Sequence, residues 1–425
     1  MRMTITEKIL ARASGRQRVT PGEVVFVNVD KVMIHDVSGP GVKFVLDELE
    51  RKSGPISKFW DPSRVLIVED HFVPCPDIQS AKNIRILEEI ARKFNVTNYF
   101  KHGIGYYGIC HALIPEGGYV LPGEVYVGGD SHTNTAGALG AFATGLGHTD
   151  IAYVLIYGKI WLKVPETMLF RIEGDLREGV MAKDVILSII RDIGVDGANY
   201  KAMEFTGSTI KRMIMDERFT LTNMSTECGA KNGIIEPDQI TLDYITNRTT
   251  QRFTPVYSDD DAEYADVIDY EAEKFEPVVA KPFSPANVST ARELSNVEID
   301  RAFIGSCTGG KLHDLREAAK VLKGRKVRVR TIIIPATQSI YMQALDEGLI
   351  RIFLEAGAIV GAPTCGPCIG GHMGVLGEGE RCISATNRNF RGRMGHRDSE
   401  TYLASPRTVA ASAVKGYICD PRDLA

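Results

Sequence analysis

The chain has 425 residues, of which 44% are hydrophobic and 24% are charged, and its formal net charge is −4. These values are typical of a globular protein with roughly two to four domains, and they exclude a disordered, collagen-like or coiled-coil chain. A charge so close to neutral gives no electrostatic reason to expect a nucleic-acid or membrane-surface partner.

The N-terminal segment, residues 1–15, has a helical pattern with interspersed charges and lacks the apolar core of a signal peptide. No apolar run reaches the roughly 18 residues that indicate a membrane span. We therefore expect a cytoplasmic protein without disulfides, whose eight cysteines are packing thiols, metal ligands or nucleophiles.

Short β-branched runs alternate with helical stripes along the chain. The pattern predicts, in chain order, strands at 24–27 and 64–68, a helix through 84–94, a strand at 167–172, a helix through 185–193 that ends at Gly194, a strand at 300–304, a helix through 312–322, and strands at 331–334 and 358–360. This alternation favours an α/β fold with largely parallel sheets.

Two stretches indicate domain boundaries. Residues 163–166 separate a glycine-rich first third from the strand that follows. Residues 259–276 contain nine acidic residues and one lysine, and prolines follow them, which is typical of a solvated surface connection rather than a binding segment. We therefore expect three units, at residues 1–165, 166–285 and 286–425.

Three cysteines form the first candidate site. Cys307 follows the strand at 300–304, and Cys365 and Cys368 form a CxxC after the strand at 358–360. Ligands bind at the carboxyl ends of strands in open α/β domains, and amides that begin a following helix favour thiolates. The cysteines could be buried thiols, a redox pair, part of a zinc site, or ligands of a 4Fe–4S cluster with one open iron. Structural zinc normally has four ligands, and the sequence has no second CxxC.

A second set of residues suits acid–base chemistry, because an aspartate beside a histidine fixes the imidazole tautomer and raises its basicity. These residues lie near predicted strand ends or among glycines, and they are Asp70, His71, His111, Asp130, Ser131 and His132. Each histidine could instead be a satisfied core residue. Asn223 and Glu227 are four residues apart and would share one face of a helix, as functional groups or as a cap or surface pair.

The segment 386–393 contains three arginines within six residues. Guanidinium groups bind carboxylates through two parallel hydrogen bonds, so this short segment indicates a small polyanionic substrate. A basic surface loop is the alternative interpretation.

Taken together, these motifs resemble those of the aconitase superfamily, most closely its free-standing large subunits. The resemblance covers nearly the whole chain and depends on the segments 129–133, 304–308, 365–370, 387–393 and 402–406. It implies an α/β, aconitase-like fold with three α/β/α domains around a central cleft and without the C-terminal swivel domain.

The resemblance also implies a role for each candidate residue. Cys307, Cys365 and Cys368 would hold one 4Fe–4S cluster with one iron not ligated by protein. The implied catalytic residues are Asp70, His71, His111, Asp130, His132 and Glu227, with His71 as the favoured proton donor. The implied substrate-binding residues are Arg388, Arg393, Asn387, Ser131 and Asn223.

The activity implied first is that of a hydro-lyase acting on 3-isopropylmalate in leucine biosynthesis. Alternatives are the homoaconitase reaction, dehydration of 2-methylmalate or 2,3-dimethylmalate, and a non-catalytic iron-dependent binding role. Because the chain stops at Ala425, the resemblance implies a separate small subunit that supplies the swivel domain and a serine base. The sequence departs from its relatives at Gly309, where asparagine is usual, and at Ala112, where many have glutamine.

Overall fold

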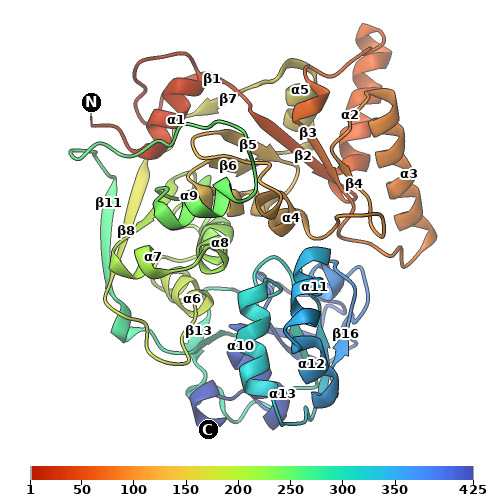
Figure 1. Ribbon diagram of the computed structural model, residues 1–425, viewed down its shortest axis with the longest axis vertical. Helices are drawn as coiled ribbons and strands as arrows, with labels where there is room; N and C mark the ends of the chain where they lie inside the picture. Colours follow the sequence, from red (N-terminus) through yellow and green to blue (C-terminus); the bar gives the residue numbers. More distant parts are fainter. Residues whose placement is uncertain (1, 425) are drawn as a thin grey trace.

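The structure is a computed structural model that describes residues 2–424. Three larger sheets with associated helices follow one another along the chain, from the N-terminal third at one end of the molecule to the C-terminal third at the other (Figure 1). This arrangement confirms the predicted α/β fold. Within residues 2–424, no helix combines the length and the apolar character that crossing a bilayer requires.

The first part of the chain forms a five-stranded parallel sheet in the order β4-β3-β2-β5-β6, and β1 and β7 pair separately as an antiparallel ribbon. Its elements are α1 (Ile5–Ala13), β1 (Val24–Asn28), β2 (Lys31–His35), α2 (Ser38–Ser53), η1 (Pro62–Arg64), β3 (Val65–Val68), α3 (Ile78–Lys93), β4 (Tyr99–Phe100), α4 (Cys110–Glu116), β5 (Val125–Gly128), the 3-10 helix η2 (Ser131–Leu139), β6 (Phe142–Gly145), α5 (His148–Tyr157) and β7 (Lys159–Lys163). Because β3, β2 and β5 are parallel neighbours, the segments after their carboxyl ends lie side by side.

The second part forms a four-stranded parallel sheet in the order β10-β9-β8-β11. Its elements are β8 (Thr167–Glu173), α6 (Ala182–Ile193), β9 (Ala202–Thr206), α7 (Ser208–Arg212), α8 (Met215–Met224), η3 (Ser225–Cys228), β10 (Asn232–Ile235), α9 (Gln239–Thr246), β11 (Asp266–Glu271) and η4 (Ala272–Lys274). The interpretation of residues 259–276 as a plain linker is wrong, since β11 is an edge strand paired with β8. Its acidic residues alternate with Val267, Ile268 and Tyr270, and an edge strand tolerates such charges.

The last part forms a seven-stranded sheet in the order β13-β12-β18-β17-β14-β15-β16, which is parallel from β18 to β16 and antiparallel at β12. Its elements are β12 (Val278–Ala280), β13 (Val288–Thr290), η5 (Arg292–Leu294), β14 (Arg301–Ile304), α10 (Leu312–Leu322), β15 (Arg330–Ile333), α11 (Gln338–Asp346), α12 (Leu349–Ala356), β16 (Ile359–Val360), η6 (Gly366–Ile369), β17 (Arg381–Ser384), β18 (Glu400–Ala404), α13 (Pro406–Lys415) and η7 (Pro421–Leu424).

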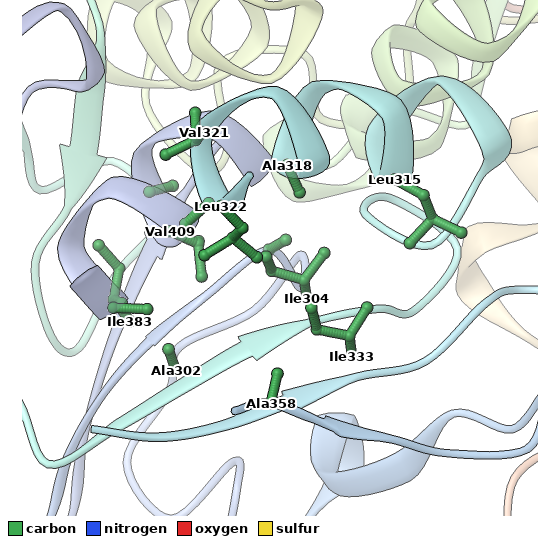
Figure 2. Close-up of a cluster of buried hydrophobic side chains, with 14 of the residues drawn as sticks. Ala302, Ile304, Leu315, Ala318, Val321, Leu322, Ile333, Ala358, Ile383 and Val409 are labelled. Carbon is green, nitrogen blue, oxygen red and sulfur yellow. The ribbon is translucent and has the colours of Figure 1, made fainter. Parts of the chain in front are cut away.

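The core of this last part lies between α10 and the sheet. Leu315, Ala318 and Leu322 project from α10 toward Ile304 on β14 and Ile333 on β15 (Figure 2). All five side chains are fully buried or nearly so, and burying each large aliphatic one contributes about 1.5–3 kcal/mol. The loop after β14 therefore rises from a rigid platform.

The sheets change twice along the chain, between β7 and β8 and between β11 and β12. The first change falls at residues 164–166, next to the expected boundary at 165. The second falls between Glu271 and Val278, earlier than the expected boundary at 285, because β12 already pairs with β18. The division into domains at 165 and 285 remains a prediction.

Candidate active site

His71 forms a close pair with Asp70 in the segment that follows β3. Its Nδ1 lies 2.7 Å from Asp70 Oδ1, and both residues are buried. Burial disfavours the charged imidazole, but the carboxylate of Asp70 and the nearby Cys365 outweigh it, so the pKa of His71 is raised well above its ordinary value. His71 can therefore carry a proton at neutral pH.

Asp130, which follows β5, is the centre of a second group of histidines. Its Oδ1 lies 2.7 Å from His111 Nε2 and accepts a hydrogen bond from the backbone N–H of His132 at 2.8 Å. Burial opposes ionisation of Asp130, but the hydrogen bonds and charge of its histidine partners outweigh burial and hold its pKa well below the ordinary value. Burial lowers the pKa of His111, and the carboxylate of Asp130 opposes part of this shift. Ser131 begins η2 directly after Asp130 and is half-buried.

Glu227 joins this histidine group to the last part of the chain. Its Oε1 accepts a hydrogen bond from Arg388 Nε at 2.7 Å and lies 3.1 Å from His132 Nε2. Burial would raise the pKa of Glu227, but these two partners outweigh it and lower the pKa. The prediction that Glu227 shares a helical face with Asn223 is wrong, because α8 ends at Met224 and Glu227 lies on the following 3-10 turn, η3.

The three candidate cysteines are buried, and two of them, Cys307 and Cys368, lie near asparagine side chains. Asn387 Nδ2 lies 3.4 Å from Cys307 Sγ, while Asn387 Oδ1 lies 3.9 Å from Cys368 Sγ. Asn223 Nδ2 lies 3.2 Å from Cys307 Sγ. Cys307 and Asn387 follow the neighbouring parallel strands β14 and β17, which explains how residues 80 positions apart meet.

The CxxC loop also contacts the histidine side of the site. The backbone N–H of Cys365 donates a 3.0 Å hydrogen bond to the carbonyl of Asp70, and Thr364 Oγ1 donates to the same carbonyl at 2.9 Å. The sulfur group and the acid–base group are thus two sides of one site.

The expectation that a helix start would favour the Cys307 thiolate is wrong. Helix α10 begins at Leu312, five residues after Cys307, and burial raises the pKa of the Cys307 thiol to about 12. Burial also raises the pKa of Cys365. A group that binds these sulfurs as thiolates must therefore bring positive charge with it, as a metal centre does.

The sulfur arrangement fits a cluster better than a single zinc ion. Around one zinc, sulfurs at about 2.3 Å from the metal are less than about 4 Å apart. Among the described residues, the three cysteine sulfurs do not form a group within 4.8 Å of one another. A larger inorganic core with three thiolate ligands suits them. Two closer groups of possible ligands, which are His35, Asp36, Asp70 and His71, and His111, Asp130 and His132, are engaged in hydrogen bonds with each other and with the backbone.

The three arginines of segment 386–393 lie in different surroundings. Arg388 is paired with Glu227, and the Nε of Arg393 is buried with no hydrogen-bond partner among the described residues. Arg391 is exposed and pairs with Asp398 at the surface. Glu227 Oε2 is likewise buried and unpaired within the described chain. Arg393 and Glu227 thus each have one buried polar atom without a hydrogen-bond partner in the described chain.

Sequence analysis missed four buried polar residues around this site. His35 ends β2 and Asp36 follows it, close to a strand end like Asp70 and His71, so this signal was present in the sequence. His35 Nδ1 accepts hydrogen bonds from the backbone N–H groups of Val37 and Ser38, and its ring centroid lies 4.4 Å from that of His71.

The other two missed residues are Lys183 and Lys311, which flank the Cys307 loop. Lys311 Nζ lies 3.3 Å from the Cys307 carbonyl oxygen and 2.9 Å from Asp314 Oδ2. Lys183 Nζ donates to Thr308 Oγ1 at 3.0 Å. Neither lysine belongs to a motif that a single sequence reveals.

The two departures from the resemblance have different surroundings. A Cβ atom at Gly309 would lie 2.4 Å from Ala385 Cβ and 2.8 Å from the Gly305 carbonyl oxygen, so the fold leaves no room for a side chain there. Ala112 instead lines a cavity of about 130 Å³ together with Glu116 and Lys311.

Comparison with known proteins gives a consistent result. The model of the aconitase family (aconitate hydratase) matches residues 7–294 and 287–416. Proteins named 3-isopropylmalate dehydratase large subunit from Heliobacterium modesticaldum and Thermodesulfovibrio yellowstonii are each 52% identical, with all of this chain and all of theirs covered. The protein of that name from Aquifex aeolicus is also 52% identical, over 100% of this chain and 98% of its own.

A solved structure, that of Thermococcus kodakaraensis aconitase X in its holo-form, aligns with 85% of this chain and 84% of its own at a TM-score of 0.48 and 12% identity. That likeness is too distant to support an argument.

Proposed function

The chain belongs to the aconitase family, and on that premise we propose that it is the large, cluster-bearing subunit of a hydro-lyase that isomerises 3-isopropylmalate in leucine biosynthesis. The reaction removes water from a hydroxy-dicarboxylate and adds it back with the hydrogen and hydroxyl positions exchanged. Full-length relatives at 52% identity carry this name.

One observation carries the proposal. Asn387 contacts the sulfurs of both Cys307 and Cys368, and the CxxC loop is hydrogen-bonded to Asp70, the partner of His71. Soft sulfur ligands thus lie next to a proton donor, which is the combination that removal of a hydroxyl group requires.

Cys307, Cys365 and Cys368 would hold a 4Fe–4S cluster, which the family implies and whose three-thiolate ligation leaves one iron open. When bound, such a cluster supplies a Lewis acid for the substrate hydroxyl. Asn223 and Asn387 donate toward Cys307 Sγ and so favour its thiolate form.

The histidines of this chain would manage the protons. His71, kept protonated by Asp70, would give its proton to the departing hydroxyl group. Asp130 holds His111 and the backbone of His132 in fixed orientations, so that the water formed is met by ordered donors. On rehydration the same groups would act in reverse.

The remaining site residues would bind and orient the substrate. Arg393, with its unpaired buried Nε, would clamp a carboxylate, and Arg388 would bind a second one while held by Glu227. Ser131, at the start of η2, would add a further hydrogen bond.

We further propose that the chain is cytoplasmic and has a partner, a small subunit that supplies a swivel domain and the serine base that removes the carbon-bound proton. The relatives' printed names support a second subunit, since each is called a large subunit.

The test is anaerobic purification of the chain alone and with a co-expressed small subunit, followed by assays with 3-isopropylmalate and with the substrates of homoaconitase and methylmalate dehydratases. We expect iron and sulfide in equal amounts in both samples, and turnover of 3-isopropylmalate only with the partner. Preference for another acid would show that the substrate is that acid and not 3-isopropylmalate. Full activity of the isolated chain would refute the need for a small subunit. A sample that binds no iron would refute the proposed function. A cluster-bearing complex inactive on every acid would favour a non-catalytic iron-dependent role.

A further inference from the structure

Lys183 is a fully buried lysine, 1% exposed, on helix α6 in the second part of the chain. Its Nζ reaches across to the last part and donates hydrogen bonds to Thr308 Oγ1 at 3.0 Å, to the Ala385 carbonyl oxygen at 2.8 Å and to the Thr386 carbonyl oxygen. Thr308 follows Cys307, and Thr386 precedes Asn387. Lys183 therefore joins the two loops whose side chains meet at the Cys307 sulfur.

The three contacts match the three hydrogens of the ammonium form, and burial together with the nearby Lys311 lowers the pKa of Lys183 to about 7. A neutral amine has only two N–H donors, whereas Nζ has three acceptors, because Thr308 Oγ1 uses its own hydrogen to bind the Ala385 carbonyl at 2.8 Å. Among residues 2–424, no carboxylate forms an ion pair with Lys183, although Lys311 on the other side of the loop is paired with Asp314. A buried charge without a paired carboxylate is costly, and an anion bound nearby would offset that cost and favour the charged form.

The loop that Lys183 contacts is under backbone strain. Ser306 has a φ of +68°, which is rare for a residue with a side chain. Such a conformation persists only where surrounding contacts hold it. The Gly309 site shows how tightly the loop is pressed on the 385–386 segment, since a Cβ there would overlap Ala385.

We propose that Lys183 is a positioning residue that locks the Cys307 loop onto the Ala385–Thr386 backbone and supplies the counter-charge for the sulfur-bound anionic cluster. The proposal rests on the proposed function for the identity of the cluster. Lys183 itself touches neither the sulfurs nor the substrate; it acts through Thr308 and through its charge.

The test compares Lys183→Met with Asp184→Asn. Asp184 is the next residue of the same helix, is equally buried, and accepts hydrogen bonds from the backbone N–H groups of Met181 and Val278 rather than from the Cys307 loop. In the full chain reconstituted anaerobically with iron and sulfide, we expect Lys183→Met to lose its cluster to a chelator about 10- to 100-fold faster than wild type. We also expect its cluster reduction potential to be lower, because a positive charge is gone. Asp184→Asn should lower the melting temperature and, because it removes a negative rather than a positive charge, should not lower the potential.

A second pair of variants keeps the test decisive where Lys183→Met does not fold. Thr308→Val removes the hydroxyl that Lys183 contacts at nearly constant volume, and Thr308→Ser retains it. We expect faster cluster loss from Thr308→Val and near-wild-type behaviour from Thr308→Ser. Cluster loss and potential equal to wild type in Lys183→Met, or equal behaviour of the two Thr308 variants where Lys183→Met is unfolded, would overturn the inference.

The cluster-free chain separates this inference from the proposed function. Hydrogen exchange of the amides at 305–310 should be faster in Lys183→Met than in Asp184→Asn, whether or not the chain binds iron. A wild-type chain that takes up no iron would refute the proposed function but leave this exchange comparison to decide the positioning role. Equal protection in the two variants would refute the positioning role alone.

Discussion

The histidine side of the site balances its charges within the chain. Asp70 pairs with His71, and Asp130 accepts hydrogen bonds from His111 and the backbone of His132. The sulfur side is built differently. The Cys307 thiol has a raised pKa, Lys183 lacks a carboxylate partner within the described chain, and the Nε of Arg393 is unpaired there.

This difference shows two ways of preparing a site. The histidine side is organised before anything binds, since its orienting hydrogen bonds are already made. The sulfur side has a fixed backbone but unpaired polar groups, which, under the proposed function, a cluster and a substrate carboxylate would pair with. Variants on the two sides should therefore fail in different ways.

The largest expected effect comes from Cys307→Ser, on the side that depends on a bound group. Serine oxygen is a poor substitute for a thiolate ligand, so we expect complete loss of cluster and activity while the fold is kept. Iron and sulfide analysis with circular dichroism measures this. Cys75→Ser, at an exposed thiol, is the control. A variant that unfolds, or that binds iron like wild type, would contradict the claim that Cys307 holds the cluster but is not needed for the fold.

The next effect is on the histidine side, where His71→Asn should lower kcat by about 10²- to 10⁴-fold because a general acid is lost. The cluster content should stay unchanged, which distinguishes this variant from Cys307→Ser. His396→Asn, at an exposed histidine, serves as the control. Loss of iron in His71→Asn would show that the two sides are not separable.

The same variant has a pH signature. The pKa of His71 is raised in the folded chain, so its charged pair with Asp70 stabilises the fold. This contribution is complete at pH values below the unfolded pKa of about 6.5. It is lost as the pH rises through the folded pKa. In cluster-free samples, the difference in unfolding free energy between wild type and His71→Asn should be larger at pH 6 than at pH 10, two values chosen as roughly bracketing that range. Denaturant titrations at both values measure it, and an equal difference would contradict the charged pair.

The bounds of helices and strands could be predicted from the sequence more accurately than the contacts between these elements. The strands at 64–68 and 300–304 and the helix through 312–322 agree with the structure to within about one residue because their hydrophobic periods are clear. The order of strands in a sheet is not encoded locally, so nothing in the sequence reveals that β17 lies beside β14 and brings Asn387 to Cys307.

Two residues illustrate the limit on the site itself. In the sequence, Lys183 cannot be distinguished from an ordinary lysine on a helix surface. It is buried because α6 packs against α8 and against the last part of the chain. Glu227 was identified, but its 3-10 turn was not, because the end of α8 at Met224 lacks a glycine or proline signal. Tertiary packing, rather than local pattern, decides both.

A smaller effect tests whether the sulfur side is rigid in its backbone. Gly309→Ala places a Cβ within 2.4 Å of Ala385 Cβ, so we expect a loss of about 1–3 kcal/mol in the unfolding free energy of the cluster-free chain. Gly377→Ala is the matched control, since its nearest atom would be Glu380 Oε2 at 3.5 Å. Equal stability of the two variants would mean that the Cys307 loop can move to accommodate the added Cβ. The backbone on the sulfur side would then not be rigid.

The smallest effect concerns the unpaired guanidinium. Arg393→Lys keeps the positive charge but removes the planar pair of donors, so we expect KM for the hydroxy acid to rise about tenfold with little change in kcat or cluster content. Arg391→Lys tests the same chemistry two residues away, where the arginine is exposed and already paired with Asp398, and its KM should not move. Because both variants conserve charge, a rise confined to Arg393→Lys would support a carboxylate clamp that depends on the guanidinium geometry. An equal rise of KM in both variants would show that the loop as a whole, and not the guanidinium of Arg393, affects substrate binding. It would contradict a carboxylate clamp at Arg393.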